Sequence, residues 1–208
     1  MRLRPVPYLI PAVVIGLVFV APALARAGAP TDQLKASVEQ IVKVLEDPTL
    51  RPEARAQERR AAIRREAEGV FDFSETAKRA LGRHWQALAE KDRQEFTGLF
   101  TDLIERAYIS KIERYSGERI AYAGEAVEGG LATVRTRFVT KQGTEVPVDY
   151  RMQQRENRWL VYDVSVEGVS LINNYRTQFD KIIQTSSYAE LVRKMKAAEF
   201  AAPAAPRS

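Results

Sequence analysis

The sequence predicts an α+β protein, with a four-stranded antiparallel sheet covered by helices that precede and follow it. Three patterns predict this class. Apolar residues recur at steps of three and four between residues 31 and 108, which is the period of a helix with one buried face. Between residues 119 and 166 the period is two, as in half-buried strands. Beyond residue 168 the helical period returns, and a sheet with one apolar face needs helices to cover it.

Two helices are expected at the start of the domain. The first begins at Thr31, which is a suitable N-cap, and ends at Asp47-Pro48. The second runs from Pro52 to Glu68. Gly69 is expected to stop it, because glycine readily adopts the left-handed conformation that ends many helices.

A third, short helix precedes the central one. Asp72 is expected to cap it, with Glu75 at the third helical position, and Leu81-Gly82 is expected to end it. The central helix has a wide apolar stripe, made of Phe96, Leu99, Phe100, Leu103, Ile104, Ala107 and Tyr108. We therefore expect it to pack on the sheet that follows.

Four segments alternate with period two: residues 119–127, 131–141, 145–153 and 158–166, separated by Gly129-Gly130, Gln142-Gly143 and Glu156-Asn157. They predict an antiparallel meander. In the last strand the alternation places Leu160, Tyr162 and Val164 on one face. It places Trp159 and Val161 on the other.

Two helices are expected after the sheet. One starts at Gly168, and the other follows a capping box made by Ser187 and Glu190. No internal repeat is visible, so residues 28–200 are expected to form a single domain. The Ala/Pro-rich segment 201–208 is expected to be a disordered tail.

The first 27 residues have the three parts of a secretory signal peptide. Arg2 and Arg4 form a positive start, residues 8–20 are mostly apolar, and the small residues that follow permit cleavage after Ala25 or Ala27. An uncleaved N-terminal anchor is the alternative reading. The chain contains no cysteine, which excludes lipoprotein processing and disulfide bonds. The expected location is the periplasm.

Charge gives no reason to expect a nucleic-acid partner. Residues 1–27 contain three arginines and no acidic residue, so their removal lowers the net charge from +5 to +2. No basic tract with interleaved aromatic residues follows.

The residue types needed for catalysis are scarce. His84 is the only histidine, so it provides neither a metal site nor a catalytic triad, and Ser165 and Ser170 have no histidine partner to activate them. Asp163 lies within a strand beside aromatic residues and is a candidate base. The preferred interpretation is that Asp163 accepts a hydrogen bond from a neighbouring helix end. We therefore expect no catalytic residue, no metal site and no cofactor.

The segment from Trp159 to Phe179 resembles the signature of the MlaC (toluene-tolerance) family. In that family a final strand ending in Tyr-Asp leads into Gly-Val-Ser and then a helix bearing Asn-Tyr-Arg-x-x-Phe, as in WLVYDVSVEGVSLINNYRTQF here. Other pieces that fall in the family's order are Phe71-Asp72-Phe73, Leu81-Gly82 with Trp85, Phe96 to Tyr108, Tyr115-Ser-Gly-Glu118 and Val148-Asp-Tyr-Arg151. The likeness covers about residues 31–200. Ala89 departs from it, because a Thr or Ser cap is expected before the central helix.

This resemblance implies a periplasmic phospholipid-binding protein that is not an enzyme. Such a protein shuttles glycerophospholipids between two membrane complexes and thereby supports outer-membrane lipid asymmetry. One is an outer-membrane MlaA-like lipoprotein with a porin, and the other is an inner-membrane MlaFEDB-like ABC transporter complex with an MlaD-like subunit. The implied fold is NTF2-like or MlaC-like, with an internal hydrophobic lipid cavity. Phospholipid is then the cargo, with its headgroup near solvent.

The apolar faces of the expected sheet and helices supply candidates for the lipid-binding wall. They are Phe100, Leu103, Tyr108, Val134, Phe138, Val148, Tyr150, Met152, Tyr162, Val164, Ile172, Tyr175 and Phe179. Periodicity alone does not separate a cavity wall from a filled core. Tyr150, Tyr162 and Tyr175 are candidates for a polar rim. Arg176 is a candidate either for a headgroup phosphate or for a structural ion pair.

Two other functions remain open from the sequence. One is an NTF2-like small-molecule enzyme that uses Asp163 as a base together with Tyr150 or Tyr162. The other is a carrier of different hydrophobic lipids, such as hopanoids, because a methylene chain has the same chemistry in each.

Overall fold

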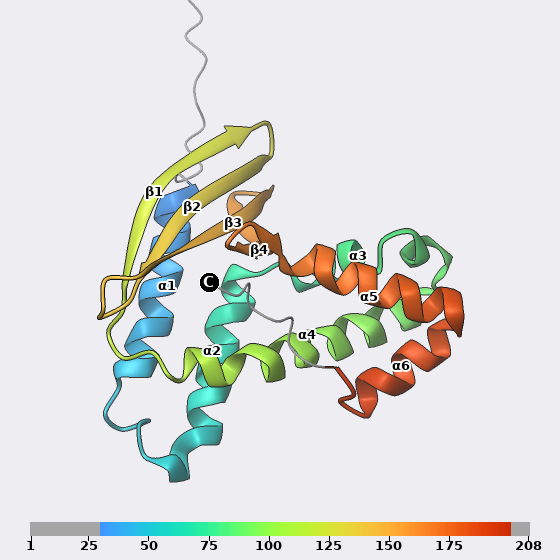
Figure 1. The fold of residues 1–208 in the computed structure, drawn as a ribbon, viewed down its shortest axis with the longest axis horizontal. Coiled ribbons are helices and arrows are strands. Elements are labelled where there is room, and N and C mark those ends of the chain that lie inside the picture. The colour runs from blue at the N-terminus through green and yellow to red at the C-terminus, as the bar shows by residue number, and fades with distance from the viewer. Residues whose placement is uncertain (1–29, 201–208) are drawn as a thin grey trace, which may run out of the picture.

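The structure, a computed structural model, describes residues 30–200. An antiparallel sheet occupies one end of the molecule and a group of helices the other, and the long helix α4 runs from one part to the other (Figure 1). The predicted signal peptide, residues 1–27, and the predicted tail, residues 201–208, lie outside the described residues.

The helices before the sheet are α1 (Pro30–Glu46), η1 (Glu53–Arg55), α2 (Ala56–Val70), α3 (Phe73–Leu81), η2 (Gly82–Ala87) and α4 (Glu90–Ile112). The predicted cap of α3 is confirmed, because Asp72 Oδ1 accepts the Glu75 N–H at 2.9 Å. Thr31 is not a cap; it lies inside α1 and donates to Glu125. Gly69 does not stop α2, which continues to Val70. Ala89 precedes α4 without a side-chain cap, as its residue type requires.

The sheet has five strands in the order β1-β2-β3-β4-β5, where four were predicted. They are β1 (Arg119–Glu128), β2 (Leu131–Val139), β3 (Glu145–Arg155), β4 (Arg158–Val166) and β5 (Val169–Ser170), and each pairs antiparallel with the next. The extra strand follows from a two-residue hairpin turn. Glu167 and Gly168 both have positive φ (51° and 81°), which matches the twist of paired strands. Gly168 therefore makes a turn and does not start a helix.

A bulge interrupts the predicted alternation of β4. Arg151 pairs with Asp163 and Met152 with Val161, so Tyr162 is the extra residue. The bulge changes which residues face inward on its two sides. Val161 and Val164 therefore belong to the same apolar cluster, although strict alternation places them on opposite faces.

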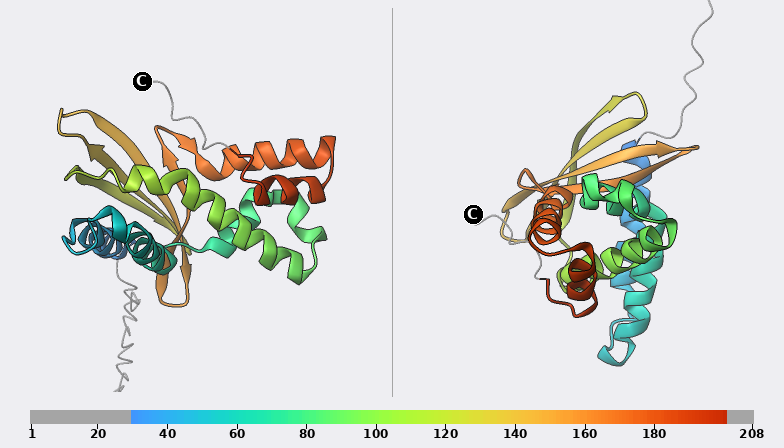
Figure 2. Two further views of the ribbon diagram at one scale, coloured as in Figure 1. Left: turned by 90° about the horizontal axis from the view of Figure 1, so that it is seen from below. Right: turned by 90° about the vertical axis from the view of Figure 1, so that its right-hand side faces the viewer.

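The last helices are α5 (Leu171–Thr185) and α6 (Tyr188–Lys196). Ser170 caps α5 by accepting the Asn173 N–H at 3.1 Å. Ser187 caps α6 by accepting the Glu190 N–H at 3.1 Å, which confirms the predicted cap. Figure 2 shows α5 and α6 with α3 and the first part of α4 in a helical group beside the sheet.

Two separate cores hold the molecule together. The helical core joins α3, η2, α4, α5 and α6 around aromatic residues such as Phe96, Phe100 and Phe179. The sheet core joins the start of α1 and the end of α2 to β2, β3 and β4, with Leu34 and Met152 fully buried. Helix α4 has 23 residues and is about 35 Å long, so it extends beyond the helical core. Its second half faces a space in front of the sheet.

Candidate functional site

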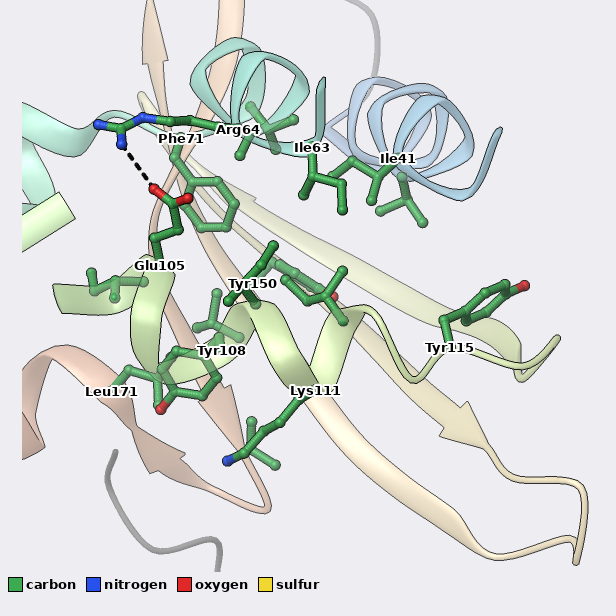
Figure 3. Close-up of a pocket in the computed structure, with 18 of the residues that line it drawn as sticks. Ile41, Ile63, Arg64, Phe71, Glu105, Tyr108, Lys111, Tyr115, Tyr150 and Leu171 are labelled. Carbon is green, nitrogen blue, oxygen red and sulfur yellow. Dashed lines mark hydrogen bonds and ion pairs between the residues drawn. The ribbon is translucent and has the colours of Figure 1, made fainter. Parts of the chain in front are cut away.

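A cavity of about 610 Å³ lies between the sheet, the helical hairpin α1–α2 and the second half of α4 (Figure 3). Its size is in the usual range for a ligand site. The lining is mostly apolar, and its polar members include the buried side chains of Thr76, Thr101 and Asp163. Such a lining can shield an apolar ligand from water.

Helices α1 and α2 form one wall of the cavity. The residues of α1 that line it lie three or four positions apart and so share one face: Leu34, Val38, Ile41, Val42 and Leu45. Helix α2 adds Ile63, Ala67 and Val70. Leu34 and Val70 also pack into the sheet core, whereas Ile41 and Leu45 remain partly accessible through the cavity.

The opposite wall comes from α4, and the sheet closes the back. Helix α4 contributes Thr101, Ile104, Glu105, Tyr108, Ile109, Lys111 and Ile112. The strands and the start of α5 contribute Ile120, Phe138, Tyr150, Tyr162, Asp163, Val164, Val166, Leu171 and Ile172. Figure 3 shows Tyr150 between the two walls and Tyr108 on α4 near Leu171.

Six of the thirteen predicted wall residues line this cavity: Tyr108, Phe138, Tyr150, Tyr162, Val164 and Ile172. Their contact with lipid stays a prediction. Phe100, Leu103, Tyr175 and Phe179 instead lie in the helical core, because the first half of α4 packs on α5 and α6. Val134 and Met152 lie under α1 in the sheet core, and Val148 is buried outside the cavity lining.

Sequence reasoning missed the whole α1–α2 wall. The stripe from Leu34 to Leu45 is visible in the sequence, but nothing in it tells whether such a face meets a neighbour or a space. The structure separates the two cases. The first turns of α1 pack on the sheet through Leu34. In the last turns, Ile41 and Leu45 line the cavity.

Four tyrosines line the cavity: Tyr108, Tyr115, Tyr150 and Tyr162. Burial raises the pKa of both Tyr108 and Tyr150 to about 12. Their hydroxyls therefore stay protonated at neutral pH and are available as donors. Within residues 30–200 neither hydroxyl has a hydrogen-bond partner, so each is free to donate to a carbonyl oxygen of a ligand.

Three other residues considered from the sequence lie outside the cavity lining. The Tyr175 hydroxyl is buried in the helical core without a hydrogen-bond partner among residues 30–200, and burial raises its pKa. It is therefore not part of a polar rim. Arg176 lies outside the cavity lining, where its Nε donates to the Arg79 carbonyl at 2.7 Å. His84 pairs with Asp180 at 2.7 Å on the helical part.

Ion pairs join α2 to α4 along one side of the cavity. Arg59 and Arg60 both bind Glu113, at 2.9 Å each. These guanidinium groups lower the pKa of the Glu113 carboxyl, with Arg60 having the larger effect. Arg64 binds Glu105 at 2.8 Å and Asp102 at 3.1 Å (Figure 3 shows the Glu105 pair). The pairs fix α2 to α4 over the length of the wall.

Asp163 is engaged in structural bonds. Its carboxylate accepts the Ser170 hydroxyl at 2.6 Å and the Ile172 N–H at 3.2 Å, and it forms an ion pair with Arg151 at 3.4 Å. The preferred sequence prediction, a bond to a neighbouring helix end, is confirmed. The carboxylate thus positions the start of α5.

A sequence model of the family described as "MlaC protein" matches residues 35–197, nearly all of the described chain. The chain belongs to the MlaC family. The family segment from Trp159 to Phe179 comprises β4, β5 and the first part of α5, and the Asp163 bonds hold these three elements together.

A curated MlaC relative is similar over part of its length. The chain is 22% identical over 142 residues to the intermembrane phospholipid transport system binding protein MlaC of Haemophilus influenzae. The alignment covers 66% of this chain, and the chain spans 66% of that relative's length, just under two thirds.

A solved structure has the same fold. It is the phospholipid-binding protein of Ralstonia solanacearum in complex with a phospholipid, with a TM-score of 0.74 and 24% sequence identity. The match covers 82% of this chain and 97% of the Ralstonia chain. The MlaC-like fold predicted from the sequence is therefore confirmed.

Two kinds of feature are absent from residues 30–200. None of the helices there has the length and apolar content needed to cross a bilayer. The same residues hold no group of three or more His, Cys, Asp or Glu side chains arranged for a metal ion.

Proposed function

We propose that this chain is a periplasmic carrier that binds a phospholipid with its acyl chains in the cavity and its headgroup near solvent. The observation that carries the proposal is the apolar cavity between α1–α2, α4 and the sheet. The MlaC relatives support it, since one is named for phospholipid transport and another was solved with a phospholipid. The signal-peptide pattern of residues 1–27 supports the location.

The energy of lipid transfer explains why such a carrier needs a cavity. Two acyl chains carry about thirty methylenes, and each costs about 0.8 kcal/mol in water. The chains therefore cost on the order of 20 kcal/mol or more if left exposed. An exposed patch leaves one side of the chains in water. A cavity between two walls, such as the one between α1 with Ile41 and α4 with Tyr108, can enclose them from both sides.

The same cost determines how lipid is exchanged. A carrier that holds lipid by burial does not release it quickly into water, so we propose that transfer occurs while it is docked to partner proteins. The proposed partners are an MlaD-like subunit of an inner-membrane MlaFEDB-like ABC transporter and an MlaA-like outer-membrane lipoprotein with a porin. Any net energy input then comes from the ATP-driven partner.

The geometry of Asp163 argues against the enzyme alternative. A general base needs a free lone pair directed at substrate. The Asp163 oxygens instead contact structural partners: Oδ2 accepts the Ser170 hydroxyl and pairs with Arg151, and Oδ1 accepts the Ile172 N–H. The relatives that the chain matches are named for phospholipid binding and transport.

Native mass spectrometry of the protein purified from the periplasm tests this function. We expect a co-purified mass that denaturation releases as phospholipid. The variant Ile41→Asp places a charge in the cavity wall and is expected to lose the ligand, while Lys43→Asp, on the exposed face of the same helix, is expected to keep it. A released hopanoid favours the other-lipid alternative, and a ligand-free wild type contradicts the proposal.

Lipid exchange between vesicles tests the docking step. With the protein alone, exchange is expected to be slow, because each release exposes apolar chains to water. Addition of the partner proteins is expected to accelerate it strongly. Equally fast exchange in both cases would contradict partner-dependent release.

A further inference from the structure

The cavity meets solvent mainly at the C-terminal end of α4. Four of the residues that line it are exposed: Arg60, Lys111, Ile112 and Arg114. Three of these lie within four positions of one another, and we call Lys111, Ile112 and Arg114 the rim. A polar hollow of about 510 Å³ adjoins the cavity at this end and shares Leu45 and Tyr115 with it. The rim is therefore the place where an enclosed ligand reaches water.

The cations that line the cavity differ in their ion pairs. Arg60 binds Glu113, and Arg64 binds Glu105, Asp102 and Glu68. Lys111 and Arg114, by contrast, form no ion pair with any residue of the described range 30–200. Both are exposed and so carry charge without a carboxylate partner there.

The carboxylates of the cavity lining have other partners. Glu105 binds Arg64, and Glu118 accepts the N–H and the hydroxyl of Ser116, at 2.7 Å each. Asp163 is held by the start of α5, as described above. None of these three acids forms an ion pair with Lys111 or Arg114 within residues 30–200, although Glu118, whose hydrogen bonds come from neutral groups, keeps its negative charge.

The two rim cations lie in one turn of the backbone, and Lys111 also lies beside a phenol group. Arg114 follows Lys111 in the same turn, and its N–H donates to the Lys111 carbonyl at 3.3 Å. Residues three apart in such a turn present their side chains to one side. The Lys111 amine lies 5.0 Å from the centre of the Tyr108 ring, and Figure 3 shows both groups on the same side of α4.

We propose that Lys111 and Arg114 bind the phosphate group of the carried lipid, and that Tyr108 marks the depth at which its acyl chains begin. The proposal rests on the proposed phospholipid-carrier function and adds its polar contact. A guanidinium and an ammonium both form charge-assisted hydrogen bonds to phosphate oxygens. The adjoining polar hollow leaves room for the rest of the headgroup. This site gives preference for a lipid with a phosphate over a neutral lipid with the same chain.

The test compares two lipids that differ only in the phosphate. Binding of a lysophosphatidic acid and of the monoacylglycerol with the same acyl chain is measured by calorimetry below their micelle concentrations. The variants are Lys111→Gln/Arg114→Gln and a control, Lys35→Gln/Arg135→Gln. The control removes two exposed charges that do not line the cavity, so its net charge matches. Thermal melting confirms that both variants are folded.

We expect the rim variant to lose about five- to tenfold in affinity for the phosphate lipid, as exposed ion pairs of modest strength imply. Its affinity for the neutral lipid should be unchanged, and the control should behave as wild type. The preference should also weaken as salt is added. If the rim variant keeps the wild-type preference, or if the control loses as much, the assignment is overturned. If neither lipid binds the wild type, the carrier function itself fails.

Discussion

At the residue scale, Asp163 joins three elements of the fold through one side chain. It lies in β4, receives the hydroxyl of Ser170 in β5 and the N–H of Ile172 in α5, and is 4% exposed. A buried carboxylate with such bonds stabilises the local structure, because its loss leaves buried donors without an acceptor. Its role is thus to fix the start of α5 next to the cavity.

Replacement of Asp163 by Asn measures that role. Asn keeps the shape but weakens the bonds, so we expect the free energy of unfolding to fall by about 1–2 kcal/mol. Phospholipid binding by the folded variant should stay close to wild type. Urea unfolding and lipid titration give the two values. Arg151→Gln is the control, and its loss should stay below about 1 kcal/mol, because Arg151 is largely exposed. Loss of a catalytic activity in Asp163→Asn would support the enzyme alternative.

Mutation of Leu103 and of Ile41 compares a core position with a cavity position. Leu103→Ala should lower the free energy of unfolding by about 2–5 kcal/mol, because it opens a new void in the helical core. Ile41→Ala enlarges a space that already exists, so it should cost about 1 kcal/mol or less and weaken phospholipid binding about tenfold. Denaturant titration and lipid binding of both variants give the comparison. Equal effects of the two variants on binding would contradict the assigned wall.

At the element scale, Glu113 attaches α2 to the end of α4. Arg60 and Arg59 lower the pKa of its carboxyl below the ordinary value of about 4.5. A lowered pKa means that the unfolded chain binds a proton first as the pH falls. This contribution is complete above about pH 5 and is lost as the pH falls through 4.5 toward the folded pKa.

The pH dependence of Glu113→Gln tests this attachment. At pH 7 the variant should be less stable than wild type, and the difference should shrink between pH 5 and pH 3. Chemical unfolding at several pH values measures it. Glu53→Gln, which lies next to the same segment without an ion pair among residues 30–200, is the control and should show no such trend. A difference that is constant with pH would contradict the assignment.

The elements differ in how far the sequence predicts them. The helices from α1 to α4 and the four long strands follow from hydrophobic period, and all of them except β1 contain buried residues. Strand β5 and the bulge at Tyr162 do not, since a two-residue strand and a single extra residue are shorter than any period. Capping residues such as Asp72 and Ser187 are local signals, and both are confirmed.

The cavity wall is less predictable than the elements. Phe100 and Tyr108 share one helical stripe in the sequence, yet the first lies in the helical core and the second in the cavity wall. The difference depends on where α5 and α6 end along α4, which is a property of tertiary packing. A stripe shows that a face is buried, and only the fold shows whether protein or ligand covers it.

At the scale of the whole molecule, bound lipid should contribute to stability. A ligand that binds only the folded state at about 100 times its dissociation constant adds about 2.7 kcal/mol. For a domain of this size that corresponds to about 5–11 °C in Tm. We expect delipidated protein to melt lower by this amount and to recover on addition of phospholipid. Calorimetric scans of both forms measure the shift, and identical melting temperatures would contradict a stably bound lipid.

The presence of two separate cores has a practical consequence for optical work. The chain contains two tryptophans, and each core holds one, Trp85 in the helical core and Trp159 in the sheet core. Trp85→Phe and Trp159→Phe therefore yield proteins whose intrinsic fluorescence reports on a single half. In Trp85→Phe, emission from Trp159 follows the part that encloses the cavity, and in Trp159→Phe, emission from Trp85 reports on the helical core as the reference.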